Sequence, residues 1–259
     1  MPRQISTVLC DLDGVVWLAH EPIPGSVDAI AQLRRDGVRV LFVTNNSAAL
    51  VAEHEAALRT IGVKAVGDVV SSSMAAAFLV AAGERVLVAG GPGVAEAVAS
   101  RGAVVVPNTG LELDAPVDAV VVGLHRDFDY DRLRIAGRAV LDGARLIGTN
   151  GDSTYPTPRG LEPGGGSIVA AISMVGGVAA TIAGKPEQPM AELIVDLLGT
   201  PDEPFDPSNV LMIGDRPETD GLFAERLGCD FALVESGVTP VGAGTHADLS
   251  AVVASFRDR

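Results

Sequence analysis

Short apolar runs rich in β-branched residues alternate with amphipathic stretches along almost the whole chain. This alternation predicts βα units whose strands form a parallel sheet that is buried on both faces. The predicted fold class is therefore α/β, with a doubly wound parallel sheet. The predicted strands are residues 6–10, 38–43, 68–70, 85–89, 103–106, 119–122, 145–148, 210–213 and 231–234.

Local signals between these strands predict where helices begin and end. Pro24 and Gly25 precede a helix for which Ser26 is the expected N-cap, and Gly37 is expected to end it. The segment from Thr154 to Gly166 is rich in glycine and proline and is expected to be a connection. Further helices are predicted from residue 71 onward, over 129–141, 167–175 and 189–198, and near 220–227.

The order of these elements indicates two domains. From about Glu84 the βα pattern starts again, and it continues through residue 148 as a complete small α/β domain. The outer parts of the chain would then form one sheet that this domain interrupts. We predict a core of residues 1–76 and 181–259, with an inserted α/β domain over residues 77–180.

Composition and charge exclude several classes of partner. The 259 residues are 47% hydrophobic and carry a formal net charge of -14, with no cluster of Lys and Arg. Such a chain repels phosphate backbones and anionic lipids, so neither nucleic acid nor membrane is an expected partner. The start of the chain lacks the pattern of a signal peptide, and no apolar run is long enough to span a bilayer. We therefore expect a cytoplasmic protein.

Polar residues follow the predicted strands where parallel α/β sheets bind their ligands. They are Asp11 and Asp13, Thr44 and Asn45, Gly184 and Lys185, and Asp215 with Asp220. Several carboxylates in one place repel one another unless a hard divalent cation lies among them, and Mg²⁺ meets that requirement. An Asp carboxylate can also attack phosphorus and form an aspartyl phosphate that water later opens.

Four motifs resemble the ordered motifs of the haloacid dehalogenase (HAD) superfamily. They are Asp11-Leu12-Asp13-Gly14, Thr44-Asn45-Asn46, Lys185-Pro186, and Gly214-Asp215 with Thr219-Asp220. The insertion between the second and third motifs is similar to the large, C2-type α/β cap of NagD-type sugar phosphatases, p-nitrophenyl phosphatases, and phosphoglycolate or glycerol phosphate phosphatases. This resemblance covers nearly the whole chain and implies a Rossmann-like core with a cap domain.

The resemblance implies a role for each motif residue. Asp11 would be the nucleophile and a Mg²⁺ ligand, and Asp13 the general acid and base, with its backbone carbonyl on the metal. Lys185 would neutralise the phosphate and the nucleophile. Asp215 would bind the metal directly and Asp220 through water. The residues expected to bind substrate are Thr44, Asn45, Asn46, Lys185 and Arg216, together with Asp152, Tyr155 and Ser167 of the cap.

The implied function is hydrolysis of a small phosphorylated metabolite by a Mg²⁺-dependent phosphatase. Asp13 favours a phosphatase over a dehalogenase, because a halide leaves without protonation. A homo-oligomer formed through the cap is a partner that this architecture allows. Each of these residues also has a simpler possible role. Asp11 and Asp13 could cap the next turn, Thr44 could be a capping hydroxyl and Lys185 a solvated loop lysine. Asp220 could be only a helix N-cap, and Arg216 a surface charge.

Two alternatives to the phosphatase stay open at this point. One is a protein of the same fold that binds a phosphometabolite without turnover. The other is a nucleotide-binding oxidoreductase, because Gly90-Gly91-Pro92-Gly93 follows a predicted strand and begins a helix. The spacing of these glycines differs from the dinucleotide-binding pattern, and a tight strand-to-helix turn explains them more simply.

Overall fold

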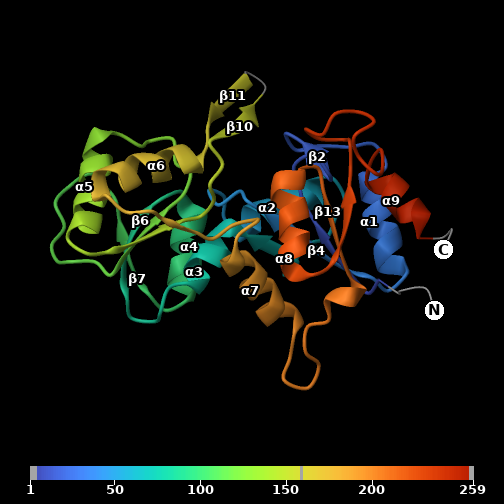
Figure 1. Ribbon diagram of the computed structural model, residues 1–259, viewed down its shortest axis with the longest axis horizontal. Helices are drawn as coiled ribbons and strands as arrows, with labels where there is room; N and C mark the ends of the chain where they lie inside the picture. Colours follow the sequence, from blue (N-terminus) through green and yellow to red (C-terminus); the bar gives the residue numbers. More distant parts are fainter. Residues whose placement is uncertain (1–4, 158–159, 257–259) are drawn as a thin grey trace. The chain divides into compact units, whose positions relative to one another are not determined.

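The computed structural model describes residues 5–157 and 160–256, which form two compact α/β units (Figure 1). The first unit contains the residues up to Thr44, residues 52–70 and the residues from Lys185 onward. The second unit contains residues 45–51 and 71–184. The sequence placed the two boundaries at 76/77 and 180/181, whereas the compact units change at 70/71 and 184/185. Among the described residues, no helix is both long and apolar enough to cross a membrane.

The first unit is built on a five-stranded sheet in the order β14-β13-β1-β4-β5. The central strand β1 pairs in parallel with β13 on one side and β4 on the other, so that Cys10 lies level with Ile213 and Phe42. Every residue of β1 and β13 is buried, as the continuous apolar runs predicted. The strands are β1 (Thr7–Cys10), β4 (Arg39–Thr44), β5 (Val69–Ser71), β13 (Val210–Gly214) and β14 (Asp230–Leu233).

Helices and short turns connect and cover this sheet. Helices α1 and α9 pack against each other, and so do α7 and α8 (Figure 1). A short antiparallel pair, β2 (Trp17–Leu18) and β3 (Glu21–Pro22), follows β1. The helices are α1 (Ser26–Arg35), α2 (Val51–Thr60), α7 (Gln188–Leu198), α8 (Leu222–Leu227) and α9 (Leu249–Ser255), with a 3₁₀ turn at Pro207–Asn209 and a π-helical turn at Pro217–Gly221.

The start of α1 corrects one prediction. Gly25 is the N-cap, in a left-handed conformation with φ of 82°, and Ser26 is the first helical residue. The Ser26 hydroxyl donates a hydrogen bond to the carbonyl of Val16 at 2.8 Å instead of capping the helix. The prediction was wrong because the tertiary contact with Val16 satisfies the hydroxyl, and glycine supplies the backbone conformation that this turn requires.

The second unit has its own five-stranded parallel sheet, in the order β12-β9-β8-β6-β7. Helices α5 and α6 cover one face, where Ile135 and Ile172 pack against Leu87 and Val120. Helix α4 contacts β6 and β7 and packs against α3. The strands are β6 (Arg85–Ala89), β7 (Val104–Pro107), β8 (Ala119–Val122), β9 (Arg145–Gly148) and β12 (Thr181–Ile182), and the helices are α3 (Ser72–Phe78), α4 (Pro92–Ser100), α5 (Tyr130–Leu141) and α6 (Gly165–Gly176).

The segment expected to be a connection contains a β-hairpin. Strands β10 (Thr154–Thr157) and β11 (Gly160–Pro163) pair in antiparallel fashion, with Tyr155 opposite Glu162. Both strands contain proline and β11 begins with glycine, so they lack the alternation of apolar residues by which strands are recognised. Residues 158 and 159 lie outside the described part of the chain.

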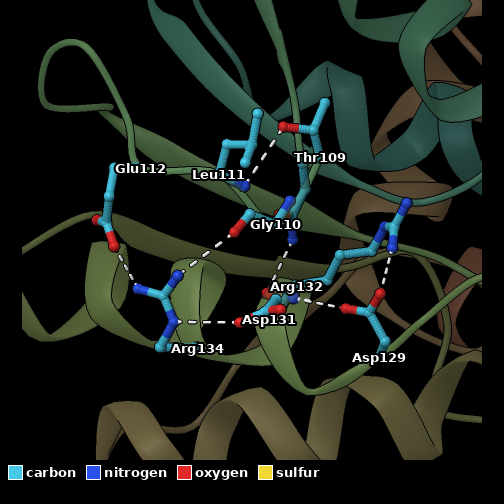
Figure 2. A network of polar contacts seen from close by, with 9 residues as sticks. Thr109, Gly110, Leu111, Glu112, Asp129, Asp131, Arg132 and Arg134 are labelled. Carbon is cyan, nitrogen blue, oxygen red and sulfur yellow. Dashed lines mark hydrogen bonds and ion pairs between the residues drawn. The ribbon is translucent and has the colours of Figure 1, made fainter.

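Ion pairs fasten the loop before β8 to the start of α5 (Figure 2). The Asp129 carboxylate caps α5 by accepting from the backbone N–H of Arg132 at 2.8 Å. The Arg134 guanidinium pairs with Glu112 and lies 3.5 Å from Asp131. All of these carboxylates are more than half exposed. The network therefore lies in solvent, on the surface of the second unit.

Candidate active site

The candidate site of the first unit lies where β1, β4 and β13 end. Because the three strands are parallel and in register, the residues that close them lie at one edge of the sheet. Asp11 follows β1, Thr44 is the last residue of β4, and Asp215 follows β13. Strand order reverses beside β1, and such reversals open a crevice at the carboxyl edge of a sheet. Thr44 is 2% exposed and Asp215 1%, so both belong to the buried floor of this edge.

Lys185 joins two of the predicted carboxylates. Its Nζ atom lies 2.8 Å from Asp11 Oδ1 and 2.6 Å from Asp220 Oδ1. The three side chains are 3%, 13% and 0% exposed, respectively. Burial alone would lower the pKa of Lys185, but the adjacent Asp11 and Asp220 carboxylates outweigh burial and raise it above its usual value. The lysine is therefore a permanent cation held against Asp11.

Asp220 is placed by the π-helical turn at Pro217–Gly221. Its Oδ2 atom accepts from the backbone N–H of Arg216 at 3.2 Å, while Oδ1 faces Lys185. Gly214 allows this approach, since a Cβ atom at that position would lie 2.2 Å from the Cβ of Asp220. Burial raises the pKa of Asp220, against the stabilising charge of Lys185. Both oxygens of Asp220 are thus engaged inside the protein.

Asp215 has one satisfied oxygen and one that lacks a partner. The backbone N–H of Val238 donates to Oδ2 at 2.8 Å, and Oδ1 is buried with no hydrogen-bond partner among the described residues. Gly14 and Gly237 leave room for the carboxylate, because a Cβ atom would lie 2.4 Å and 2.0 Å from Oδ2, respectively. The glycine of the first motif is therefore needed for close approach, and its φ of 90° also favours glycine.

The three carboxylates fit a divalent cation. One oxygen from each of Asp11, Asp215 and Asp220 can be chosen so that all lie within 4.8 Å of one another. Burial, followed by the charge of Asp11, raises the pKa of Asp215 to about 6. Lys185 balances only one of the three negative charges. The partnerless oxygen of Asp215 and the all-oxygen donor set match what Mg²⁺ and Ca²⁺ prefer.

Asp13 sits in the tight loop that follows Asp11. The indole N–H of Trp17 donates to Asp13 Oδ1 at 3.0 Å. Asp13 is partly accessible to solvent, but the surrounding protein removes water from its carboxyl group and so raises its pKa. The negative charge of Asp11 raises this pKa further. The hydrogen bond from Trp17 opposes this rise. The sequence did not single out Trp17, because a lone Trp after an acidic motif reads as an ordinary apolar residue.

The predicted residues of the second unit form separate contacts of their own. Asn45 Nδ2 lies 3.5 Å from Asp152 Oδ2, and Asn46 Oδ1 accepts from the backbone N–H of Ala48 at 3.1 Å. The Ser167 hydroxyl donates to the carbonyl of Ser153 at 2.7 Å. The predicted site residues therefore fall into two groups, one in each compact unit, with Arg216 in the first.

Tyr155 belongs to a charged cluster on the hairpin. Its hydroxyl donates to Glu162 Oε2 at 3.0 Å and accepts from the guanidinium of Arg126. Arg126 also lies 3.3 Å from Glu162 Oε2 and 5.8 Å from the centre of the Tyr155 ring. Burial and the hydrogen bond to Glu162 raise the pKa of Tyr155. Arg126 and Glu162 could not be predicted from the sequence, because no local sequence pattern indicates which charged residues will contact a tyrosine.

The glycines at residues 90–93 serve packing. A Cβ atom at Gly91 would lie 2.7 Å from the carbonyl oxygen of Ala48, and one at Gly93 would lie 2.0 Å from that of Ala49. The backbone N–H of Gly93 donates to Ala48 at 3.0 Å, and Pro92 has no N–H to offer. Two of the amides that a phosphate-binding turn would use are therefore occupied or absent, which disfavours the nucleotide-binding alternative.

Comparisons with known proteins agree on one family. A family model described as haloacid dehalogenase-like hydrolase matches residues 8–104, and one described as HAD-hydrolase-like matches residues 182–258. An acid sugar phosphatase from Staphylococcus saprophyticus is 35% identical over 241 residues, covering 92% of this chain and 89% of that protein.

Two solved structures have the same fold along nearly the whole chain. A glycerol phosphate phosphatase from Mycobacterium tuberculosis in complex with magnesium gives a TM-score of 0.83 at 33% identity, covering 95% of this chain and 76% of that one. A p-nitrophenyl phosphatase from Archaeoglobus fulgidus gives a TM-score of 0.86 at 26% identity, covering 97% and 99% of the two chains. These matches confirm the resemblance predicted from the four motifs and the predicted α/β fold class.

Proposed function

Since the chain belongs to the haloacid dehalogenase-like hydrolases, we propose that it hydrolyses the phosphate ester of a small metabolite, with Asp11 as the nucleophile. The observation that carries this proposal is the buried contact of Lys185 with Asp11 and Asp220. A cation fixed at 2.8 Å from Asp11 Oδ1 offsets the negative charge of this carboxylate and lowers the repulsion between it and an incoming phosphate.

The reaction then has two steps on Asp11. An oxygen of the carboxylate attacks phosphorus as the ester oxygen leaves, which gives an aspartyl phosphate. Water opens this intermediate in the second step and restores the carboxylate. Thr44, buried at the end of β4, is the candidate hydroxyl that orients the phosphoryl group. Phosphoryl transfer asks the protein mainly for positioning and charge neutralisation, and this edge of the sheet supplies both.

Asp13 is the candidate general acid. A carboxyl group with a raised pKa holds its proton closer to neutral pH than an ordinary aspartate does. Because Trp17 occupies Oδ1, the proton would be carried by Oδ2. In the first step Asp13 would protonate the leaving oxygen, and in the second it would take a proton from water.

Asp11 and Asp215 are the residues that would hold Mg²⁺, with Asp220 acting through water and the backbone carbonyl of Asp13 as a further ligand. The partnerless buried Oδ1 of Asp215 supports this assignment. A divalent cation bound there would supply positive charge against which the phosphate and Asp11 can approach each other. The glycerol phosphate phosphatase from Mycobacterium tuberculosis is described in two solved structures, one in complex with magnesium and one in complex with calcium.

The substrate class follows from the relatives and from the inserted unit. The relatives are named for sugar phosphate, glycerol phosphate and p-nitrophenyl phosphate activities, which share a small leaving group. We assign the second unit as the cap that selects this leaving group, through Asp152, Tyr155 and Ser167. The first-unit residues can recognise only the phosphoryl group and the metal, so discrimination has to come from elsewhere.

A panel of sugar, polyol and aryl phosphates tests the proposal. The purified protein should release phosphate with added Mg²⁺ and lose activity after treatment with a chelator. The Asp11→Asn variant should lower kcat by about four orders of magnitude or more, since it removes the nucleophile but keeps the shape of the side chain. Tight binding of a phosphate ester with release no greater than in Asp11→Asn would instead support the protein that binds without turnover.

A further inference from the structure

Two junctions between the compact units adjoin residues of the proposed chemistry. The chain first leaves the first unit between Thr44 and Asn45, re-enters it over residues 52–70, and returns to it for the last time between Gly184 and Lys185. Thr44 and Lys185 therefore each have a peptide neighbour that belongs to the second unit. Because Asn45 and Gly184 are directly bonded to these two residues, restraints on Asn45 and Gly184 limit the positions that Thr44 and Lys185 can adopt.

Asn45 is held through its backbone carbonyl. The Ser72 hydroxyl donates to this carbonyl at 2.7 Å, and Asn150 Nδ2 donates to it at 2.8 Å. Ser72 is the first residue of α3 and is 0% exposed, while Asn150 lies just after β9 and is 5% exposed. Two buried donors from distant parts of the chain thus converge on the Asn45 carbonyl, which lies on the side of Asn45 that faces Asn46 along the chain.

Gly184 is held by the same group of residues. Its backbone N–H donates to the carbonyl of Thr149 at 2.8 Å. The site has no room for a side chain, because a Cβ atom would lie 2.5 Å from Thr149 O and 2.9 Å from Ser72 Cβ. Thr149, which is 0% exposed, also donates to the hydroxyl of Ser47 at 2.8 Å. Residues 45, 47, 72, 149, 150 and 184 therefore form one uncharged network, buried except at Asn45, which is partly exposed, and we call it the junction clamp.

We propose that Ser72 and Asn150 are positioning residues. Both hold Asn45 directly, Asn150 also adjoins the Thr149 carbonyl that holds Gly184, and together they restrict where the Thr44 hydroxyl and the Lys185 amine can lie. The proposal rests on the proposed phosphatase function and extends it to residues that do not touch the phosphate. Misplacement of a reacting group by about 1 Å can lower a rate about a hundredfold, so a small shift of Thr44 or Lys185 should be visible in kcat.

The test compares Ser72→Ala and Asn150→Ala with a matched control, Ser71→Ala. Ser71 is the neighbouring buried serine at 1% exposure, but its hydroxyl pairs with Ser73 at 2.7 Å and not with Asn45. With p-nitrophenyl phosphate and saturating Mg²⁺, we expect kcat to fall about tenfold or more in the two clamp variants and KM to change less than about threefold. Ser71→Ala should keep kcat within about twofold of the unaltered protein.

Amide hydrogen exchange provides a readout that needs no activity. Exchange at the amides of residues 44–47, 184 and 185 should become faster in both clamp variants and stay unchanged in Ser71→Ala. Ser72→Ala removes a single oxygen atom, so it keeps the test available if Asn150→Ala does not fold. Unchanged exchange in folded Ser72→Ala overturns the clamp. Faster exchange with unchanged kcat overturns the positioning role.

The same measurements separate this proposal from the phosphatase itself. If the unaltered protein releases no phosphate from any ester, the proposed function fails, and the exchange data alone then decide the clamp. If the unaltered protein is active and the variants raise KM without lowering kcat, the clamp serves substrate binding. The proposed positioning of Thr44 and Lys185 is then wrong.

Discussion

The two units use the same kinds of ion pair in opposite surroundings. On the second unit, Arg134 pairs with Glu112 and Asp131 across a surface where the three side chains are 43%, 76% and 70% exposed (Figure 2). In the first unit, Lys185 pairs with Asp11 and Asp220 where exposure is 3%, 13% and 0%. The distances alone do not tell the two networks apart, but their access to water does.

Access to water determines how strongly the charges of each network interact. Solvent screens the charges around Arg134 and offers each of them a substitute partner, so the surface network adds little to stability. The charges around Lys185 are desolvated, so they are stabilised mainly by one another. Removal of one charge leaves the others buried without a compensating partner. A site that must change its charge distribution during a reaction benefits from the second arrangement, because fixed charges need no reorganisation.

Removal of the Lys185 charge should have the largest effect, because this charge lies in the buried network. Lys185→Met would leave Asp11 and Asp220 facing each other in the interior and should lower the free energy of unfolding by on the order of 3–5 kcal/mol, measured by urea denaturation. It should also depress turnover of every phosphate ester together, since all of them share the phosphoryl group.

Lys64 is the matched control, because it is the only other lysine of the sequence and is exposed. Lys64→Met should change the free energy of unfolding by less than about 0.5 kcal/mol. Similar losses in the two variants would contradict the distinction between buried and exposed charges.

Magnesium should stabilise the first unit in a manner that depends on pH. Burial raises the pKa of Asp215 from 3.8 to about 6, so the metal-free folded state binds more protons than the unfolded state between these values. The Asp215 contribution therefore lowers stability as pH rises through that window. A bound cation opposes this loss, because it favours the ionised carboxylate.

Thermal unfolding with and without Mg²⁺ measures this effect. The increase in Tm on addition of Mg²⁺ should be larger at about pH 7.5 than at about pH 5, and at a hundredfold excess over Kd it should correspond to about 2.7 kcal/mol. Asp215→Asn should lose most of the increase at both pH values. An equal increase in Asp215→Asn and the unaltered protein would show that the cation binds elsewhere.

A smaller effect is expected from the partly exposed cluster on the hairpin. Tyr155→Phe removes the hydroxyl that links Arg126 and Glu162. It should change the ratio of kcat/KM between two natural phosphate esters by about threefold to tenfold, and leave p-nitrophenyl phosphate less affected. Tyr130, the other tyrosine of the sequence and 79% exposed, provides the control variant Tyr130→Phe. If both variants scale all substrates equally, the hairpin does not select the leaving group.

The smallest effect should come from the surface network itself. Arg134→Ala removes the contacts with Glu112 and Asp131 but leaves both carboxylates in solvent. The change in Tm should be less than about 2 °C, and it should shrink further with added salt. A larger shift that persists in high salt would mean that packing of the Arg134 side chain stabilises α5.

Much of the fold could be read from local chemistry. The bounds of β6, β8 and β9 agree with the predicted runs, since a buried parallel strand needs a continuous apolar segment of β-branched residues. The polar residues at the ends of β1, β4 and β13 also followed from the sequence, because parallel strands bring their carboxyl ends to one edge. Helix α9 and the β10–β11 hairpin did not, since their short, glycine-rich or mixed segments satisfy several local patterns equally well.

The sequence by itself therefore determined which chemical groups this protein brings to the edge of its first sheet, namely the carboxylates, the hydroxyl and the amine of the four motifs. Only the tertiary structure decided what each group contacts. Lys185 meets Asp220 across 35 positions of sequence, Asp215 receives the amide of Val238 across 23, and Asn150 reaches Asn45 across 105. Local rules state what a side chain requires, but the partner that satisfies it is the group that the path of the whole chain brings within about 3 Å and shields from water.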